Sequence, residues 1–159
     1  MRIGEIMTRD PLTVAPDMEV GEVAKLLVEH RLNSVPVLDA DGVLVGIVAT
    51  GDLTHRLADR HSPERQSLWR ESFYSSPLRG GTQETDRAEG RIVEQVMTRK
   101  VVSVNPDDDM AVAARMLLEH RVHALPVLED GQLAGIVSRH DLLRCLTAHP
   151  ECCNPMRRS

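Results

Sequence analysis

The chain has 159 residues, of which 42% are apolar, and its net charge is −5. A globule of this length buries roughly 70% of the surface that its unfolded chain exposes, so its core needs no disulfide or metal cross-link. Its Lys and Arg residues are scattered, which excludes the concentrated basic face of most nucleic-acid-binding proteins. No apolar run approaches the roughly 20 residues of a membrane span, and the N-terminal MRIGEIMTRD lacks a signal-peptide core, so we expect a soluble, cytoplasmic protein without a membrane partner.

The chain contains the same unit twice. Residues 1–38 are identical to residues 91–128 at 14 positions, and residues 41–57 are identical to residues 130–146 at 9 positions. The matches include EHRLNSVPVL with EHRVHALPVL and GIVATGDL with GIVSRHDL. Such a pattern indicates a tandem duplication. We therefore predict a first repeat over 1–60, an insert over 61–90, a second repeat over 91–149 and a tail over 150–159.

The first half of each unit predicts a short strand and then a helix. Residues 12–14 and 102–104 are β-prone and lie just before a proline, Pro16 or Pro106. Asp17 and Asp107 follow as candidate N-caps or first-turn acids of the helix. The apolar residues after them recur at helical spacing: Val20, Val23, Ala24 and Leu27 in the first repeat, and Met110, Ala113, Ala114 and Leu117 in the second.

The second half of each unit predicts a hairpin and a second helix. Pro36 and Pro126 favour the edge or start of a strand. The pairs Asp41-Gly42 and Asp130-Gly131 predict hairpin turns, which lead into the buried strands LVGIVA and LAGIVS. Each unit ends in an amphipathic segment that begins with an aspartate and predicts the second helix. The predicted fold is α/β (α+β), with two β-α-β-β-α repeats that pack through their sheets with pseudo-twofold symmetry.

All three residues of the Phe, Trp and Tyr types lie in the insert. They are Trp69, Phe73 and Tyr74. Trp69 and Phe73 are four residues apart and would share one face of a short helix. One interpretation is a linker whose apolar patch docks on its own sheets or helices. The other is a contact for a regulated protein partner or for a second copy of the chain, since buried aromatic residues dominate interface energetics.

The histidines and cysteines do not predict a metal site or a catalytic site. His30 and His120 stand at equivalent helix ends, where the helix dipole favours an imidazolium. The closest approach to a metal motif is the set Cys145, His149, Cys152 and Cys153. Zinc sites usually combine two separated pairs of ligands, and here there is one cluster. We expect no metal, no catalytic residues and no enzymatic activity.

The repeated motif, GIVSRHDL in the second repeat, has two interpretations. A serine at a strand end with an aspartate three residues later is a helix N-cap, and the acid also suits the helix dipole. The same hydroxyl and helix N-terminus can meet a phosphate or a sugar oxygen. The carboxylate can accept hydrogen bonds from both ribose hydroxyls, as acidic residues do in dinucleotide-binding folds. Local sequence alone leaves both interpretations open.

The order of these motifs, in duplicate, resembles the CBS domain, named after cystathionine β-synthase. The resemblance rests on VMT, the helix ending in HR, the VPVL and LPVL strands, the D-G turn and G-I-V-S-x-x-D, and it covers about 1–60 and 91–149. It implies a pair of domains, or Bateman module, with an adenosine-nucleotide site in the cleft between the repeats. One implied site has Ser138, His140 and Asp141 facing Leu32, Asn33 and Ser34, lined by Met7 and Ile136.

The mirror site implied by the resemblance has Asp52 with Ile47, Val122, His123 and Ala124, lined also by Met97. The sequence departs from the family pattern at Ala49, which stands where the second repeat has Ser138. A lost hydroxyl contact costs about 0.5–1.5 kcal/mol. We therefore expect the Asp52 site to be weaker than the Asp141 site, or selective for another ligand.

The predicted function is that of a regulatory module. An adenosine nucleotide such as AMP, ADP or ATP would bias the geometry of the two repeats, with S-adenosylmethionine or an NAD-type molecule less favoured. The resemblance also implies a homodimer. Two alternatives stay open: a structural or dimerisation module without bound nucleotide, and the regulatory subunit of an enzyme or transporter that is a separate polypeptide.

Overall fold

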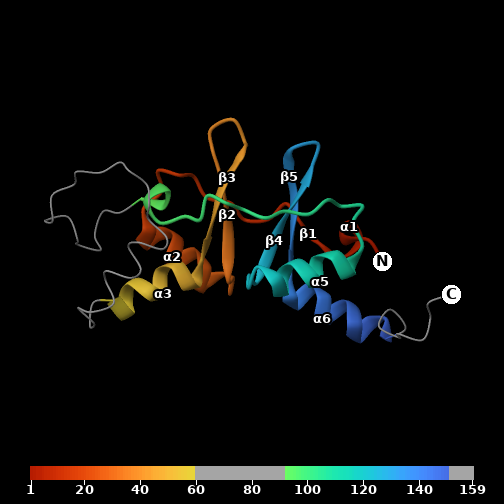
Figure 1. Ribbon diagram of the computed structural model, residues 1–159. Coiled ribbons are helices and arrows are strands. Elements are labelled where there is room, and N and C mark those ends of the chain that lie inside the picture. The colour runs from red at the N-terminus through yellow and green to blue at the C-terminus, as the bar shows by residue number, and fades with distance from the viewer. Residues whose placement is uncertain (60–91, 151–159) are drawn as a thin grey trace, which may run out of the picture.

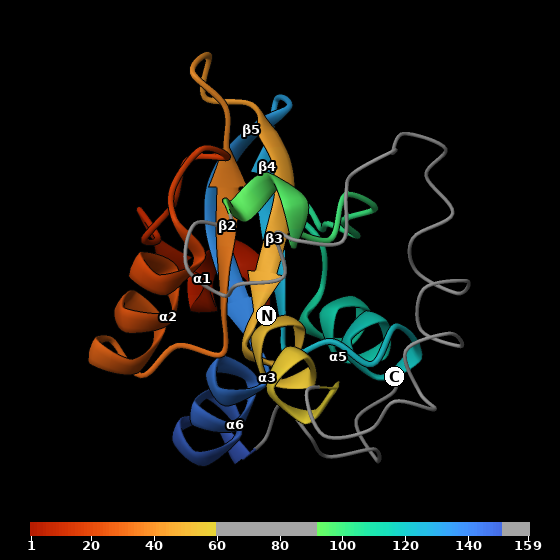
Figure 2. The ribbon, with the colours of Figure 1, turned by 90° about the vertical axis from the view of Figure 1, so that its left-hand side faces the viewer.

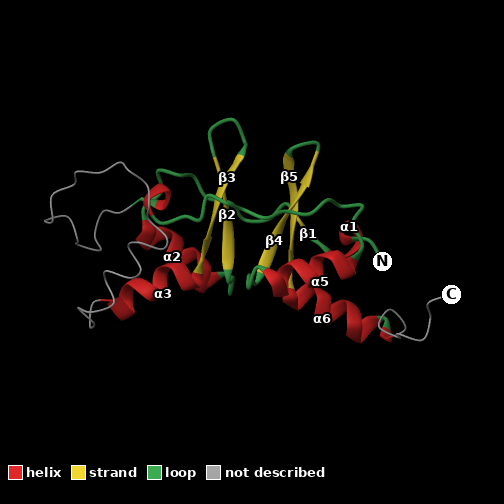
Figure 3. Ribbon diagram, viewed as in Figure 1, coloured by secondary structure: helices red, strands yellow, loops and turns green. Residues whose placement is uncertain are grey.

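The computed structural model describes residues 1–59 and 92–150 and shows two similar halves (Figure 1). In the first half, α2 (Val20–Glu29) precedes the hairpin of β2 (Ser34–Leu38) and β3 (Leu44–Ala49), and α3 (Thr50–Asp59) follows it. In the second half the equivalent elements are α5 (Met110–Glu119), β4 (Ala124–Glu129), β5 (Gln132–Ser138) and α6 (Arg139–Ala148). Figure 3 shows the same helix–hairpin–helix order in both halves. The predicted mixed fold with two repeats is confirmed.

The segments that lead into the repeats are exchanged between them. The chain begins with α1 (Ile3–Ile6) and β1 (Thr8–Arg9), and β1 pairs antiparallel with β5 of the second repeat, with Thr8 opposite Ile136. Reciprocally, the segment after the short helix η1 (Val93–Gln95) bridges to β3 of the first repeat, where the two backbone hydrogen bonds between Ile47 and Thr98 are 3.0 and 2.9 Å long. Figure 1 shows α1 on the side of β4 and β5. We call these two segments, residues 3–9 and 93–98, the leaders of the first and second repeat. Each sheet is thus completed by the leader of the other repeat.

The core follows the same exchange. Ile3 is fully buried among residues of the second repeat such as Leu117 and Leu125, whereas Val93 is fully buried with Val23 and Val48 of the first. The two apolar clusters are distinct, one for each hairpin. Neither repeat therefore completes its core from its own consecutive residues.

The two faces of each hairpin have different roles. Val35 and Val37 pack in the same core cluster as Val23 of α2, so this face of the first hairpin is covered by helices. Because successive strand residues point to opposite faces, Pro36 and its partner Ile47 lie on the other face. Figure 1 shows the two hairpins side by side, and Figure 2, turned by 90°, shows one in front of the other, so these second faces look toward the opposite repeat.

The predicted hairpin turns are confirmed. Gly42 and Gly131 have φ angles of 77° and 78°, and Asp130 has a φ of 50°. These left-handed conformations are the ones for which glycine and aspartate are favoured in tight turns. The predicted strands at 12–14 and 102–104 are reduced to single parallel bridges, Val14 to Val37 and Val104 to Val127.

The predicted helix starts at Asp17 and Asp107 are wrong. The chain first makes a turn at each place, with hydrogen bonds from Met18 N to Ala15 O and from Asp108 N to Asn105 O. The helices begin later, with Glu19 and Asp109 at the N-cap positions, and Asp109 accepts a hydrogen bond of 2.8 Å from Ala111 N. The predicted helix ends are confirmed, because His30 and His120 are the C-cap residues of α2 and α5.

The insert with Trp69, Phe73 and Tyr74 and the tail residues Cys152 and Cys153 lie outside the described residues. Within the described part of the chain, no helix combines the length and the apolar character that a membrane crossing requires.

Candidate functional site

The same backbone arrangement occurs where α3 and α6 begin. Thr50 N donates a hydrogen bond of 2.8 Å to Asn33 O, and Arg139 N donates one of 3.0 Å to His123 O. The loop before each hairpin therefore lies against the first residue of the helix that follows the hairpin. Figure 1 shows that α3 and α6 both begin at the lower ends of their hairpins and run in opposite directions. This pair of helix starts is the candidate site.

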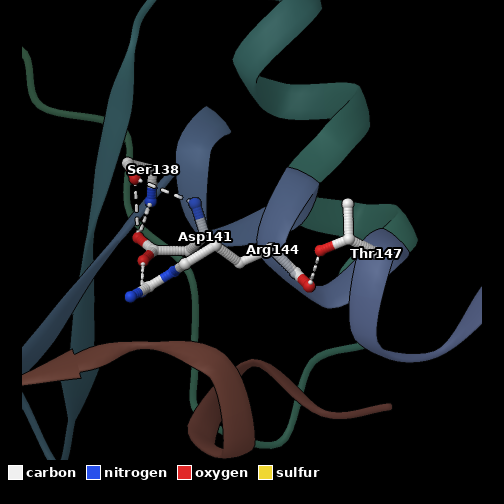
Figure 4. Close-up of polar contacts among 4 residues, drawn as sticks. All are labelled: Ser138, Asp141, Arg144 and Thr147. Carbon is white, nitrogen blue, oxygen red and sulfur yellow. Dashed lines mark hydrogen bonds and ion pairs between the residues drawn. The ribbon is translucent and has the colours of Figure 1, made fainter.

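At the start of α6, Asp141 is nearly buried, with 6% of its surface exposed. Its Oδ2 accepts hydrogen bonds from Ser138 N (2.8 Å) and from Ser138 Oγ (2.6 Å), and Asp141 N donates to Ser138 Oγ (3.2 Å). Its Oδ1 forms an ion pair with the exposed Arg144 (Figure 4). A serine hydroxyl has one proton, and here that proton is used within the capping box. The predicted cap is confirmed.

At the start of α3, Asp52 holds the equivalent position with one difference. Asp52 Oδ2 accepts a hydrogen bond of 2.8 Å from Ala49 N, the same length as its counterpart in the second repeat. Ala49 has no hydroxyl, so the side-chain half of the cap that Ser138 forms cannot form here. The carboxylate of Asp52 still ties the strand end to the helix through this backbone hydrogen bond.

On the neighbouring strand of each hairpin, serine and alanine are the other way round. In the first hairpin Ser34 is the register partner of Ala49, and in the second Ala124 is the partner of Ser138. Each site thus has one serine and one alanine in the same cross-strand pair, on opposite strands of the hairpin in the two repeats. Each candidate site therefore retains one serine hydroxyl.

The remaining predicted site residues fall into two groups. Asn33, His123 and His140 are exposed next to the helix starts, with Leu32 and Val122 half-buried beside them. Met7 and Met97 belong to the two core clusters, where they are 8% and 9% exposed. They lie against Gly135 and Gly46, which have no side chains to occupy that space.

Met7 and Ile136 consequently contact opposite faces of β5. Met7 covers the face of Gly135, and the next residue, Ile136, points to the other face because strand residues alternate. By the same alternation Met97 covers the face of Gly46, and Ile47 points away from it. The predicted joint lining of a base pocket by these residues remains a prediction.

The observed hydrogen bonds join each aspartate-bearing helix to the loop of its own repeat. Residues Val122–Ala124 lie beside the start of α6 with Asp141, where Arg139 Nε also donates a hydrogen bond of 3.1 Å to Val122 O. Residues Leu32–Ser34 lie beside the start of α3 with Asp52. The sequence-based prediction instead pairs each aspartate with the loop of the other repeat. A contact of each aspartate site with the loop of the other repeat remains a prediction.

In residues 1–59 and 92–150 no group of three or more His, Cys, Asp or Glu side chains is placed to hold a metal ion. Cys145 is buried, and its Sγ lies 2.9 Å from Met1 Sδ. The candidate site thus presents carboxylates, hydroxyls, backbone amides and the exposed side chains of Asn33, His123 and His140.

Replacing Ser138 by alanine should lower the free energy of unfolding by about 1 kcal/mol, because an N-cap hydroxyl contributes about 0.5–2 kcal/mol. Urea denaturation followed by circular dichroism measures this change. The matched variant is Ala49→Ser, which offers α3 the cap that it lacks and should raise the midpoint. An unchanged midpoint in Ser138→Ala would show that the hydroxyl does not stabilise α6.

The comparisons with known proteins agree with this fold. A family model described as CBS domain matches residues 3–59 and 93–148. The chain is 33% identical over 153 residues to the chloroplastic CBS domain-containing protein CBSX1 of Arabidopsis thaliana, covering 89% of this chain and 62% of that protein. It is 30% identical over 162 residues to an uncharacterized protein of Methanocaldococcus jannaschii, MJ1426, covering 92% of this chain and 91% of that protein.

A solved structure is also similar. The crystal structure of CBSX2 in complex with AMP superposes with a TM-score of 0.70 at 28% identity, covering 94% of this chain and 98% of that one. The chain is 31% identical over 153 residues to CBSX2, a chloroplastic CBS domain-containing protein of Arabidopsis thaliana, covering 89% of this chain and 62% of that protein. The similarity extends over both repeats of the chain.

Proposed function

The chain belongs to the CBS domain family, and on this premise we propose that it is a non-catalytic regulatory module that binds an adenosine-containing nucleotide between its two repeats. The observation that carries the proposal is the doubled helix start, in which Asp52 and Asp141 are held by identical 2.8 Å hydrogen bonds from the preceding strand. The structure of CBSX2 with AMP supports an adenine nucleotide such as AMP, ADP or ATP as the ligand.

The chemistry of the two helix starts suits such a ligand. Backbone N–H groups at the N-termini of α3 and α6, helices of ten residues each, favour the negative charge of a phosphate. A carboxylate in the first turn can accept hydrogen bonds from ribose hydroxyls. Arg144 is 63% exposed, so its side chain can turn into solvent and leave Asp141 Oδ1 to a ribose hydroxyl.

We propose that the bound nucleotide acts by shifting a conformational balance between the repeats. A ligand shifts such a balance only by its differential affinity for the two states. The predicted route of output is a homodimer contact or the insert with Trp69, Phe73 and Tyr74.

The alternative function is that of a structural module without nucleotide. The capping role of Asp141 favours it, because this role explains the aspartate without a ligand.

A thermal unfolding panel tests the proposal. AMP, ADP, ATP, S-adenosylmethionine and NAD are each added, and a ligand at 100 times its Kd should stabilise the fold by about 2.7 kcal/mol. For a chain of this length that corresponds to a rise in Tm of about 5–10 °C. The variants Asp141→Asn and Asp52→Asn should each reduce the shift.

The matched control is Asp109→Asn, which alters the N-cap of α5 and should leave the ligand-induced shift unchanged. If none of the five compounds moves the Tm at millimolar concentration, the sensor function is refuted and the structural module takes its place. A shift that survives in both aspartate variants would show that the nucleotide binds elsewhere.

A further inference from the structure

Arg144 stands out at the start of α6 because it pairs with the carboxylate that is proposed to bind the ligand. Its guanidinium forms an ion pair with Asp141 Oδ1, three residues earlier on the same helix. Figure 4 shows the arginine side chain reaching back along α6 to this oxygen. The oxygen of Asp141 that Ser138 does not use is therefore engaged by a cation before any ligand arrives.

The hydrogen bonds of Asp141 leave room for either Arg144 or a fully bound ribose, but not for both. A carboxylate offers about four lone-pair sites, two on each oxygen. The two sites of Oδ2 accept from Ser138 N and Ser138 Oγ. The two hydroxyls of a ribose need both sites of Oδ1, and Arg144 holds one of these. A ribose that binds with both hydroxyls must therefore displace the guanidinium.

The charge of the ligand decides how costly this displacement is. The side chain of Asp141 is 6% exposed and that of Arg144 is 63% exposed, so the arginine moves while the carboxylate stays in place. A neutral ligand leaves the displaced guanidinium without a charge partner. A phosphorylated ligand brings a new partner, because its phosphate is attached to the same ribose and lies within the screening length of about 8–10 Å. The site therefore favours a ligand with negative charge.

A second arginine adds positive charge to the start of α6. Arg139 and Arg144 stand where the sequence of α3 has Thr50 and His55. Arg139 Nε donates a hydrogen bond of 3.1 Å to Val122 O, which holds its guanidinium beside the loop. This bond and one further bond to a backbone oxygen use two of the five N–H donors of the guanidinium. Side chains thus add to the preference of the helix N-terminus for negative charge.

We propose that Arg144 determines the ligand class of the Asp141 site. It competes with the ribose for Asp141 Oδ1, and it pairs with the phosphate of a ligand that displaces it. This inference rests on the proposed function and concerns the selectivity of the same site. The site then selects phosphorylated adenosine compounds, such as AMP and ATP, over neutral adenosine and over S-adenosylmethionine, whose sulfonium group is a cation.

The experiment isolates the Asp141 site with Asp52→Asn and measures AMP, adenosine and S-adenosylmethionine by calorimetry, with adenosine also followed by its competition against AMP. Adding Arg144→Gln should make adenosine bind about 2- to 5-fold tighter, because an exposed ion pair no longer competes with it. AMP loses its charge partner in the same variant. The preference for AMP over adenosine, expressed as the ratio of their Kd values, should therefore fall by about 2- to 5-fold.

Two further variants serve as controls. Arg144→Lys keeps a cation that can pair with either group, so the preference for AMP should persist. Arg2→Gln removes a similarly exposed arginine, with 69% of its side chain exposed, from an ion pair with Asp107. It should leave both affinities unchanged, because this pair lies outside the candidate site.

Each result has one meaning. If the unsubstituted protein binds no adenosine compound, the proposed function and this inference fail together. If it binds AMP but Arg144→Gln leaves the preference unchanged, or Arg2→Gln lowers it as much, only this inference fails. Weaker adenosine binding in Arg144→Gln would show that the arginine supports the site instead of competing with the ligand. Three other results overturn the inference as well: S-adenosylmethionine that binds the Asp52→Asn protein as tightly as AMP, adenosine that displaces no AMP from either protein at millimolar concentration, and loss of all binding in Asp52→Asn.

Discussion

Replacing Ile3 by alanine is expected to destabilise the second repeat, although Ile3 lies at the start of the first. Ile3 is fully buried in the cluster that contains Leu117, Leu125 and Val137. Removing its side chain leaves a cavity there, and truncations of this kind cost about 2–5 kcal/mol. We expect the free energy of unfolding to fall by about 3 kcal/mol, near the middle of that range.

Hydrogen exchange shows which part of the chain responds. In Ile3→Ala the amides of β4, β5 and α6 should lose more protection than those of β2 and β3. The matched variant is Val93→Ala, whose side chain is fully buried in the first cluster, and it should produce the reverse pattern. Loss of protection in β2 and β3 upon Ile3→Ala would contradict the exchange of leader segments.

Replacing Gly135 by alanine should also be strongly destabilising. A Cβ atom at this position would lie 2.6 Å from Thr8 O and 2.8 Å from Met7 Sδ. The methionine side chain can move, but the carbonyl oxygen belongs to the backbone of β1, which is paired with β5. We expect a loss of about 2–3 kcal/mol, at the upper end of the usual cost of overpacking, measured by urea denaturation.

Gly46 provides an internal comparison for Gly135. Its closest neighbours are Met97 Sδ at 2.6 Å and Met97 Cγ at 2.9 Å, with the backbone atom Thr98 O farther away at 3.0 Å. Gly46→Ala should therefore cost less than Gly135→Ala, because a flexible side chain can give way. Gly21→Ala in α2 meets no atom within 4 Å and should stabilise by about 0.5–1 kcal/mol. Equal losses at Gly46 and Gly135 would contradict this explanation.

Both predictions concern the way in which the two repeats depend on each other. The leader of each repeat supplies a core residue and a β-bridge to the other, so neither hairpin has a complete environment alone. A nucleotide bound between the repeats would act on two halves that are already joined through these leaders.

The sequence alone determined the local structure of each repeat. Apolar spacing placed α2 and α5, the Asp-Gly pairs placed the turns at Gly42 and Gly131, and the serine–aspartate spacing at 138–141 determined the cap of α6. These features depend on residues within a few positions of one another, and the helix and turn patterns occur in both repeats. The N-caps of α2 and α5 were misplaced because Asp17 and Asp107 fit equally well in the turn that precedes each helix.

Only the tertiary structure decided which repeat each leader completes and which side chains meet at the helix starts. Ile3 and Val93 are apolar in either arrangement, so their exchange between the cores has no local signature. Met7 and Met97 are predicted ligand contacts, and only the tertiary structure places their side chains over Gly135 and Gly46. The pairing of Ser34 with Ala49 depends on the register of β2 and β3, and register is set by contacts between strands. Long-range contacts of this kind leave no periodicity in the chain, which is why the serine–alanine pairs of the two hairpins emerged only from the fold.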